Sequence, residues 1–299
     1  MVAAQGRRYS VAPPFAPARY GLLTVVDQPI DPDPHWQAGI EFQPDPCGPA
    51  SATIMNCPVV TIPAKSPTAT GLGVVGAEPF TVYAEVPCSP IGQGNDIEDL
   101  RSRAVNALTR GEARTVETVF WTGTVPSITG TPVMPHLAED TAVFEALTGT
   151  RLQTAATVVT TGAAVDVVEA IGLLEGALAV CYGGEGVIHV PATAVAALAA
   201  YSLLVKDGDR LRTFYGNRVA VYSSDDREGP TGANPAAGQG WFYATGAITL
   251  RRTGINDALA SKSSAFDRSN NTAVYIAERT YVIGWDCCHL AAQVSLLGV

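Results

Sequence analysis

The prolines of this chain are concentrated at its N-terminal end, where fifteen of the twenty-one lie between Pro13 and Pro90. Proline lacks a backbone donor and moves the residue before it out of the helical region. No long helix is therefore expected before Asp96, and this third of the chain should be extended and broken by turns. Terminal arms of this kind are ordered only where something ties them down. We predict that the first third lies on other copies of the same chain.

The charge composition restricts the class of partner. Only 16% of the residues are charged, against about 25% in an average domain, which suits a protein that covers much of its surface with partners. The formal net charge is −9, and lysine occurs only at positions 65, 206 and 262. Phosphate binding requires a basic patch. Since the sequence contains no run of basic residues, direct recognition of nucleic acid is not expected.

Targeting signals and cysteines indicate the compartment. Arg7 and Arg8 are not followed by the apolar run of a signal peptide. The longest mainly apolar run, 192–205, is shorter than a membrane-spanning helix. Cysteines occur at positions 47, 57, 88, 181, 287 and 288, with no C-x-x-C pair. In a chain of this length they are expected to be reduced thiols of a cytoplasmic protein.

The most regular segment of the sequence is 96–122, which contains no proline. Apolar residues recur there at helical spacing, with a shift near Gly111. Asn95 is a good N-cap and Gly123 a good C-terminal stop. The pattern predicts one helix of about 25 residues, whose continuous polar face places it on the body of the protein and not through its middle.

The rest of the chain mixes helices and strands. Helices are predicted over 136–147, 164–180 and 191–205, and strands over 152–161, 186–190, 215–222, 241–250, 272–285 and 290–296. A loop rich in Gly, Pro, Asp and Ala covers 223–240. The order of these elements has no βαβ rhythm, which favours an α+β fold.

This order of elements resembles the Hong Kong 97 phage coat fold, which tailed-phage major capsid proteins share with encapsulin shells. Three segments are similar to coat proteins of phages that infect actinobacteria: GLLEGALAVCYGGEGVIHVP (172–191), GWFYATGAITLR (240–251) and NNTAVYIAERTYVIGWDCCHLAAQVSL (270–296). The resemblance covers nearly the whole chain. It rests on element order and composition, because this fold has no short diagnostic motif.

The resemblance implies a division of the chain into four parts. Residues 1–39 would form the N-terminal arm and 40–75 the extension loop. The peripheral domain, with 96–122 as its spine helix, would take 76–150 and 268–299, and the axial domain 151–267. The loop 223–240 would meet a symmetry axis, and a separate scaffolding protein, or none, would be needed. Removing residues 1–37 is then expected to leave the domains folded and to prevent assembly.

The strongest candidate for a nucleophilic or metal-binding site is the run Asp286-Cys287-Cys288-His289, which places a thiolate beside an imidazole. Neighbouring residues of a strand point to opposite faces, so Cys287 and Cys288 are expected to pack in the core without sharing a ligand. His35, His136, His189 and His289 form no metal-binding spacing, and His189 is expected to be a hydrogen-bonded core histidine.

Three further patterns are interpreted as structural. The run Gly183-Gly184-Glu185-Gly186 lacks the Lys-Ser/Thr of a phosphate loop and is interpreted as a turn. Asp225, Asp226 and Glu228 could bind a cation but are expected to be solvated. In the family, some members join an extension-loop lysine to an asparagine of a neighbour. Lys65, Asn270 and Asn271 occupy suitable regions, but no such crosslink is expected. No catalytic, cofactor or metal site is therefore predicted.

The sequence thus predicts a major capsid protein that is not an enzyme and needs no cofactor. It would self-assemble into hexamers and pentamers of an icosahedral shell around DNA, without sequence-specific contacts to that DNA. Scaffolding, portal and decoration proteins are potential partners, and a membrane is not. The location would be the virion, after assembly in the host cytoplasm. An encapsulin-like shell is the first alternative, and a soluble cysteine-dependent enzyme is the distant one.

Overall fold

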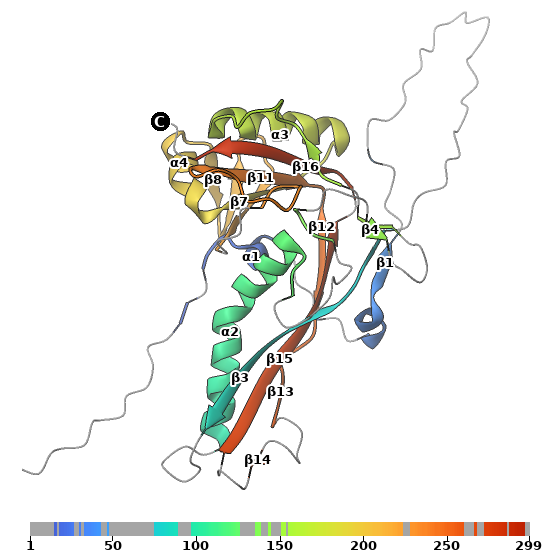
Figure 1. The fold of residues 1–299 in the computed structure, drawn as a ribbon, viewed down its shortest axis with the longest axis vertical. Coiled ribbons are helices and arrows are strands. Elements are labelled where there is room, and N and C mark those ends of the chain that lie inside the picture. The colour runs from blue at the N-terminus through green and yellow to red at the C-terminus, as the bar shows by residue number, and fades with distance from the viewer. Residues whose placement is uncertain are drawn as a thin grey trace, which may run out of the picture.

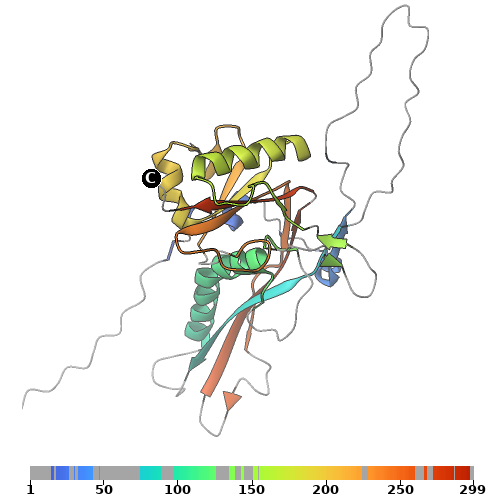
Figure 2. The same ribbon diagram turned by 45° about the horizontal axis from the view of Figure 1, so that its top comes forward.

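Two bodies, each built around its own β-sheet, stack along the long axis of the molecule (Figure 1). Figure 2 shows the same two bodies after rotation, with the helix α3 covering the upper sheet and α2 lying along the lower one. The structure is a computed structural model. It describes residues 15–16, 18–26, 30, 33–42, 47, 75–88, 97–125, 135–138, 143–144, 151–153, 155–223, 228–259, 266–267, 272–285 and 287–296.

The helix α2 (Ile97–Thr122) dominates the lower body and spans about 39 Å at 1.5 Å per residue. It confirms the helix predicted over 96–122, and it runs without a break through Gly111. Gly123 ends it with φ +69° and an N–H that donates to the Val119 carbonyl (2.8 Å), also as predicted. Asn95 lies outside the described residues. The last turn of α2 is largely buried, because Val119, Phe120 and Trp121 are all at most 1% exposed.

The lower sheet packs against the inner side of α2. Its central strand β15 (Thr272–Trp285) has the bounds predicted from the sequence and pairs with β3 (Phe80–Cys88) in nine antiparallel residue pairs. The remaining strands all pair antiparallel with β15: β12 (Ile248–Arg252), β13 (Asn256–Leu259) and β14 (Phe266–Asp267).

The upper sheet has seven strands in the order β6-β16-β11-β7-β10-β9-β8. The helices α3 (Val167–Cys181) and α4 (Val195–Ala200) pack against it, and the 3-10 helix η2 (Ala192–Ala194) leads into α4. The central strand β7 is buried along its whole length, as an apolar strand at the middle of a sheet should be. The strands are β6 (Thr157–Val158), β7 (Val187–Pro191), β8 (Leu204–Asp207), β9 (Arg210–Thr213), β10 (Arg218–Tyr222), β11 (Gln239–Thr245) and β16 (His289–Ser295).

A small third sheet lies beside the lower body, at the right of Figure 1. Its strand order is β1-β2-β5-β4. It brings together residues from far apart in the sequence: β1 (Ile40–Phe42), β2 (Val75–Ala77), β4 (Val143–Phe144) and β5 (Arg151–Gln153).

The N-terminal segment contradicts the prediction that the first third lies only on other copies. The helix α1 (Leu22–Val25) packs in the subunit's own core, where Leu22 and Val25 are fully buried. The 3-10 helix η1 (Pro34–Ala38) places Trp36, 5% exposed, against Ala77 and Val282. Residues 1–37 therefore include part of the folded core, and we no longer expect their removal to leave the domains intact. The absence of long helices before Asp96 is confirmed for the described residues.

A buried carboxylate fixes α1 to α2. Glu117, 1% exposed, accepts hydrogen bonds from the Leu22 N–H (3.2 Å) and from the Ser223 N–H (2.8 Å) and hydroxyl (2.7 Å). Gly21 lets α1 approach this side chain closely, since a Cβ at position 21 would lie 2.6 Å from a Glu117 carboxylate oxygen. This connection could not be predicted from the sequence, because a glutamate on a long polar helix is normally solvated.

Several predicted elements differ from the structure. The helix expected over 136–147 is wrong at Val143–Phe144, which form β4 through pairing with β5. The helix expected over 191–205 is shorter, because Leu204 and Val205 enter β8. The strands expected over 152–161 and 241–250 are each divided between two sheets. In each case pairing with a distant strand overrides the local pattern.

The sheets also divide the chain differently from the predicted domain ranges. β16 was placed with 268–299 but pairs with β11 in the upper sheet. β12 and β13 were placed with 151–267 but pair with β15 in the lower sheet. Among the described residues, no helix is long and apolar enough to cross a membrane.

Candidate functional site

Two adjacent aromatic side chains project into solvent at the turn between β9 and β10. Phe214 is 77% exposed and Tyr215 is 68% exposed. Beside this turn lies a groove of about 370 Å³, bounded by the C-terminal end of α3 and by the loop that leads into β7. It is lined by Ala179, Gly183, Gly184, Glu185, Arg212, Tyr215, Gly216 and Asn217. Val180, 74% exposed, also lies at this end of α3.

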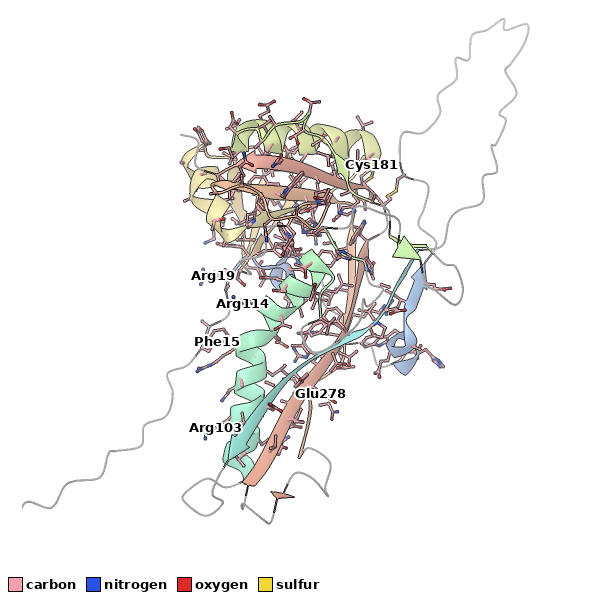
Figure 3. The ribbon with its side chains drawn as sticks, in the orientation of Figure 1. Phe15, Arg19, Arg103, Arg114, Cys181 and Glu278 are labelled. Carbon is pink, nitrogen blue, oxygen red and sulfur yellow. A yellow bond between two sulfur atoms is a disulfide. The ribbon has the colours of Figure 1, made fainter. Side chains whose placement is uncertain are left out.

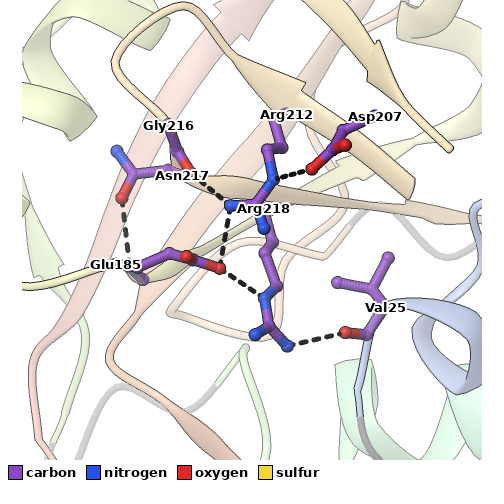
Figure 4. A network of polar contacts seen from close by, with 8 residues as sticks. Val25, Glu185, Asp207, Arg212, Gly216, Asn217 and Arg218 are labelled. Carbon is purple, nitrogen blue, oxygen red and sulfur yellow. Dashed lines mark hydrogen bonds and ion pairs between the residues drawn. The ribbon is translucent and has the colours of Figure 1, made fainter.

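Ion pairs hold the turn in place (Figure 4). Glu185 binds both Arg212 and Arg218. Arg212 also binds Asp207 (2.8 Å) and donates to the Gly216 carbonyl (2.8 Å) within the turn. Partial burial opposes ionisation of Glu185, but the two guanidinium groups outweigh it and lower its pKa below the usual range. The network therefore stays charged at neutral pH and connects three strands at the groove.

The network extends to the N-terminal segment. Arg218 donates to the Val25 carbonyl of α1 (3.1 Å). The Asn217 side chain accepts from the Gly186 N–H (3.0 Å), which joins the turn to the start of β7. Gly186 is required there, because a Cβ would lie 2.5 Å from Leu178 and 2.6 Å from the Thr245 carbonyl. Hydrogen bonds and ion pairs thus hold the backbone of this turn in place, while the side chains of Phe214 and Tyr215 remain largely exposed to solvent.

This arrangement has the properties of a docking surface. Exposed aromatic residues on a rigid support are typical of interface hot spots. The polar groups beside them are paired with one another. In the part of the chain that the structure describes, no group of three His, Cys, Asp or Glu side chains could hold a metal ion. The loop run Gly183–Gly186, interpreted as a turn, lies in the groove, with Gly183 at φ +71°.

The expectation of reduced cysteines is wrong in this structure. Cys47 is joined to Cys287, and Cys181 to Cys288, with Cα–Cα distances of 6.5 and 6.0 Å that suit disulfides. Cys287 and Cys288 do bond to different partners, but they lie between β15 and β16, with Cys288 at φ +61°, and not within a strand as the sequence predicted. The pairs connect residues 240 and 107 positions apart in the sequence, which no local pattern could reveal. Asp286 lies outside the described residues.

We expect the Cys181–Cys288 bond to stabilise the upper body substantially. The double variant Cys181→Ala/Cys288→Ala should lower the free energy of unfolding by about 3 kcal/mol, because the bond closes a long loop in the unfolded chain. Dithiothreitol should lower the stability of the natural protein by more than this, because it also reduces Cys47–Cys287, and should lower that of the variant only by the contribution of Cys47–Cys287. Peptide mapping without reduction should recover both linked pairs. Alkylation of all six cysteines in unreduced protein would contradict the pairing.

His189 is the hydrogen-bonded core histidine that the sequence predicted. It is fully buried in β7, with Nδ1 2.9 Å from the Tyr222 hydroxyl and Nε2 3.0 Å from the Thr245 hydroxyl. Burial, with a smaller contribution from His289, lowers its pKa from 6.5 to about 3. His289 itself is buried and its Nε2 lies 2.9 Å from the Leu137 carbonyl. Both imidazoles serve packing, and neither reaches the groove.

Stability should therefore fall as the pH falls below 6.5. In that range the unfolded chain protonates His189 while the folded chain does not, down to the folded-state pKa of about 3. One proton gives a slope approaching about 1.4 kcal/mol per pH unit. The slope of the free energy of unfolding against pH can be measured by urea unfolding between pH 7 and pH 5. The measurement compares the natural protein with the variants His189→Gln and His35→Gln. His189→Gln should flatten the slope, and the exposed His35 should not. Equal slopes in all three would contradict the assignment.

The remaining sequence candidates lie partly outside the described residues, including Asp225, Asp226, Lys65, Asn270 and Asn271. Glu228 is described, and its backbone carbonyl accepts from Trp121 Nε1 (3.1 Å) and from the Tyr243 hydroxyl (2.8 Å). This part of the predicted axis loop 223–240 is therefore anchored on the subunit's own core. The aromatic turn at Phe214 and Tyr215 was not singled out from the sequence, because Tyr215 was placed in a strand predicted over 215–222, which begins only at Arg218 in the structure.

Comparison with known proteins identifies solved structures that have a similar fold. No protein-family model matches the chain, and no curated protein matches its sequence. Solved structures match over nearly the whole length. The capsid of the native GTA particle has a TM-score of 0.58 at 14% identity, covering 98% of this chain and 96% of that one. The chain from Mycobacterium phage Ogopogo gives 0.52 at 15%, covering 96% of each. The Cyanophage Pam1 capsid gives 0.52 at 10%, covering 100% and 98%.

These similarities define the class of fold. The predicted α+β fold is confirmed, and it is shared with the capsid proteins of phages and of the GTA particle.

Proposed function

We propose that this chain is a major capsid protein of the Hong Kong 97 type, which self-assembles into an icosahedral shell around the genome of a tailed phage. The observation that carries the proposal is the match to capsid folds over at least 96% of both chains. The fixed aromatic turn supports it, because its exposed side chains gain burial only against a partner. A phage of actinobacteria is the proposed source, on the sequence segments quoted above.

The domain ranges are proposed in a revised form. The N-terminal arm ends before Tyr20, because residues 20–26 contribute to the core. The extension loop takes 43–74, between β1 and β2. The peripheral domain keeps α2, β3 and β15 and gains β12 and β13, and the axial domain gains β16. The function is structural, without catalysis or a cofactor, in a virion assembled in the host cytoplasm.

Size-exclusion chromatography with light scattering tests this proposal on the full-length protein. A major capsid protein should elute as capsomers and as particles of megadalton mass. A soluble cysteine-dependent enzyme would elute as a small oligomer at every concentration, and that result would refute the proposal. An encapsulin-like shell would contain protein cargo, whereas the proposed capsid contains nuclease-protected DNA when it is isolated from virions.

A further inference from the structure

Between Leu100 and Thr122, where the side chains of α2 are described, its exposed side carries charge of one sign. Half of the eight exposed side-chain positions between Leu100 and Thr122 are arginines, and none is acidic: Arg101, Ser102, Arg103, Asn106, Thr109, Arg110, Gly111 and Arg114. The two acidic residues in this span are buried. Glu112 binds Arg279 (2.7 Å) and the Tyr281 hydroxyl (2.9 Å), and Glu117 binds α1 and Ser223. This surface is positive although the chain has a net charge of −9.

The N-terminal segment adds a further arginine to this surface. The guanidinium group of Arg110 lies 5.7 Å from the centre of the Phe15 ring, and the Leu22 N–H binds Glu117 one to two turns further along α2. Arg19 lies between these two anchor points. Figure 3 shows Phe15, Arg19, Arg103 and Arg114 on the same side of α2. We call the set Arg19, Arg103, Arg110 and Arg114 the arginine stripe.

Two members of the stripe are available to an external anion. Among the described residues, Arg19 and Arg114 have no ion-pair partner, and both are exposed. Arg101, by contrast, is held by Asp257 of β13 and is not counted in the stripe. Arginine presents a planar fork of donors that matches phosphate oxygens. From Arg103 to Arg114 the stripe is about 16 Å long, which spans about five phosphates of one DNA strand.

We infer that the arginine stripe is the surface by which this protein contacts the phosphate backbone of the enclosed DNA. The inference rests on the proposed capsid function, since it requires that the shell encloses DNA. An acidic chain repels DNA over most of its surface, so a local positive strip decides which face is turned to the genome. Contacts to phosphates carry no sequence information. The sequence alone did not indicate this surface, because Arg103, Arg110 and Arg114 form no continuous basic run and Arg19 joins them only in the folded chain.

Binding of a labelled duplex to the full-length protein tests the inference. Fluorescence anisotropy with mixed-sequence DNA of about 30 base pairs, between about 50 and 200 mM NaCl, gives the salt dependence of the association constant. Two phosphate contacts, from Arg19 and Arg114, give a slope of log K against log salt of about −1.8, and the variant Arg19→Gln/Arg114→Gln should bring the slope close to zero. Arg19→Lys/Arg114→Lys should keep most of the natural slope. Lys206→Gln, which removes an exposed cation from β8, should leave it unchanged.

The outcomes separate this inference from the proposed function. Particles seen by electron microscopy, with equal DNA slopes for the natural protein and the glutamine variant, would overturn the stripe and leave the capsid function standing. If Lys206→Gln reduced the salt slope as much as Arg19→Gln/Arg114→Gln does, the binding would reflect general charge attraction, and the inference about the stripe would also be overturned. Arginine-dependent binding of polyglutamate without binding of DNA would assign the stripe to an acidic protein. Absence of particles would refute the capsid function, while the anisotropy still decides whether the stripe binds phosphate.

Discussion

Removal of residues 1–26 is expected to prevent stable folding, whereas removal of residues 1–14 is expected to leave the protein folded. The longer deletion removes Leu22 and Val25, which are fully buried beside α2, at about 2 kcal/mol each. It also removes the Leu22 N–H that binds the buried Glu117 carboxylate and the Val25 carbonyl that binds Arg218. A buried charge that loses a partner costs several kcal/mol more. Together these losses approach the whole stability of a typical domain, about 5–15 kcal/mol.

Circular dichroism and thermal unfolding of the two truncated proteins measure this effect. The 15–299 protein should unfold cooperatively, with a midpoint temperature close to that of the full-length protein. The 27–299 protein should be insoluble, or soluble without a cooperative transition. The double variant Leu22→Ala/Val25→Ala in the full chain provides a milder form of the same change and should lose about 4 kcal/mol or more. Cooperative unfolding of the 27–299 protein at the natural temperature would show that α1 is dispensable to the fold.

Loss of both aromatic side chains at the β9–β10 turn should block assembly without unfolding the subunit. In Phe214→Ser/Tyr215→Ser the changes lie at exposed positions, so the free energy of unfolding should change by less than about 0.5 kcal/mol per residue. At an interface each hot-spot aromatic contributes about 2 kcal/mol. The pair should therefore weaken each subunit contact by about 1000-fold in its association constant.

Sedimentation velocity and thermal unfolding of the same samples separate the two effects. The serine variant should remain as folded, small species at protein concentrations where the natural protein forms particles. Phe214→Tyr/Tyr215→Phe exchanges the hydroxyl group, keeps both aromatic surfaces and should assemble. Normal particles from the serine variant would mean that this turn faces solvent in the shell.

The sequence was most informative where local pattern and tertiary context agree. α2 and β15 were located closely, because 26 residues at helical spacing and a long β-branched strand have no competing local structure. The burial and hydrogen bonding of His189 were predicted correctly, because a polar residue within an apolar strand is expected to be buried and to need hydrogen-bond partners. The helix predicted over 164–180 corresponds to α3, in which Ile171, Leu174 and Leu178 are buried and Val168, at the same helical spacing, is 43% exposed.

The features that the sequence could not reveal depend on residues distant in the chain. Pairing of β4 with β5 turned a predicted helix into a strand. The two disulfides join cysteines that no spacing rule associates. Glu117 has the sequence appearance of a solvated glutamate and is instead the buried acceptor for α1. The exposure of Phe214 and Tyr215 is equally non-local, because it depends on how the Glu185 network fixes the turn.

Electron cryomicroscopy of the purified full-length protein tests the central claim most directly. The proposed function predicts closed icosahedral shells built of hexamers and pentamers. In these shells Phe214 and Tyr215 should be buried against a neighbouring subunit, and the arginine stripe of α2 should face the interior. Particles of this kind would establish the chain as a major capsid protein. A population of discrete small oligomers, with no closed shells at any protein or salt concentration, would contradict it.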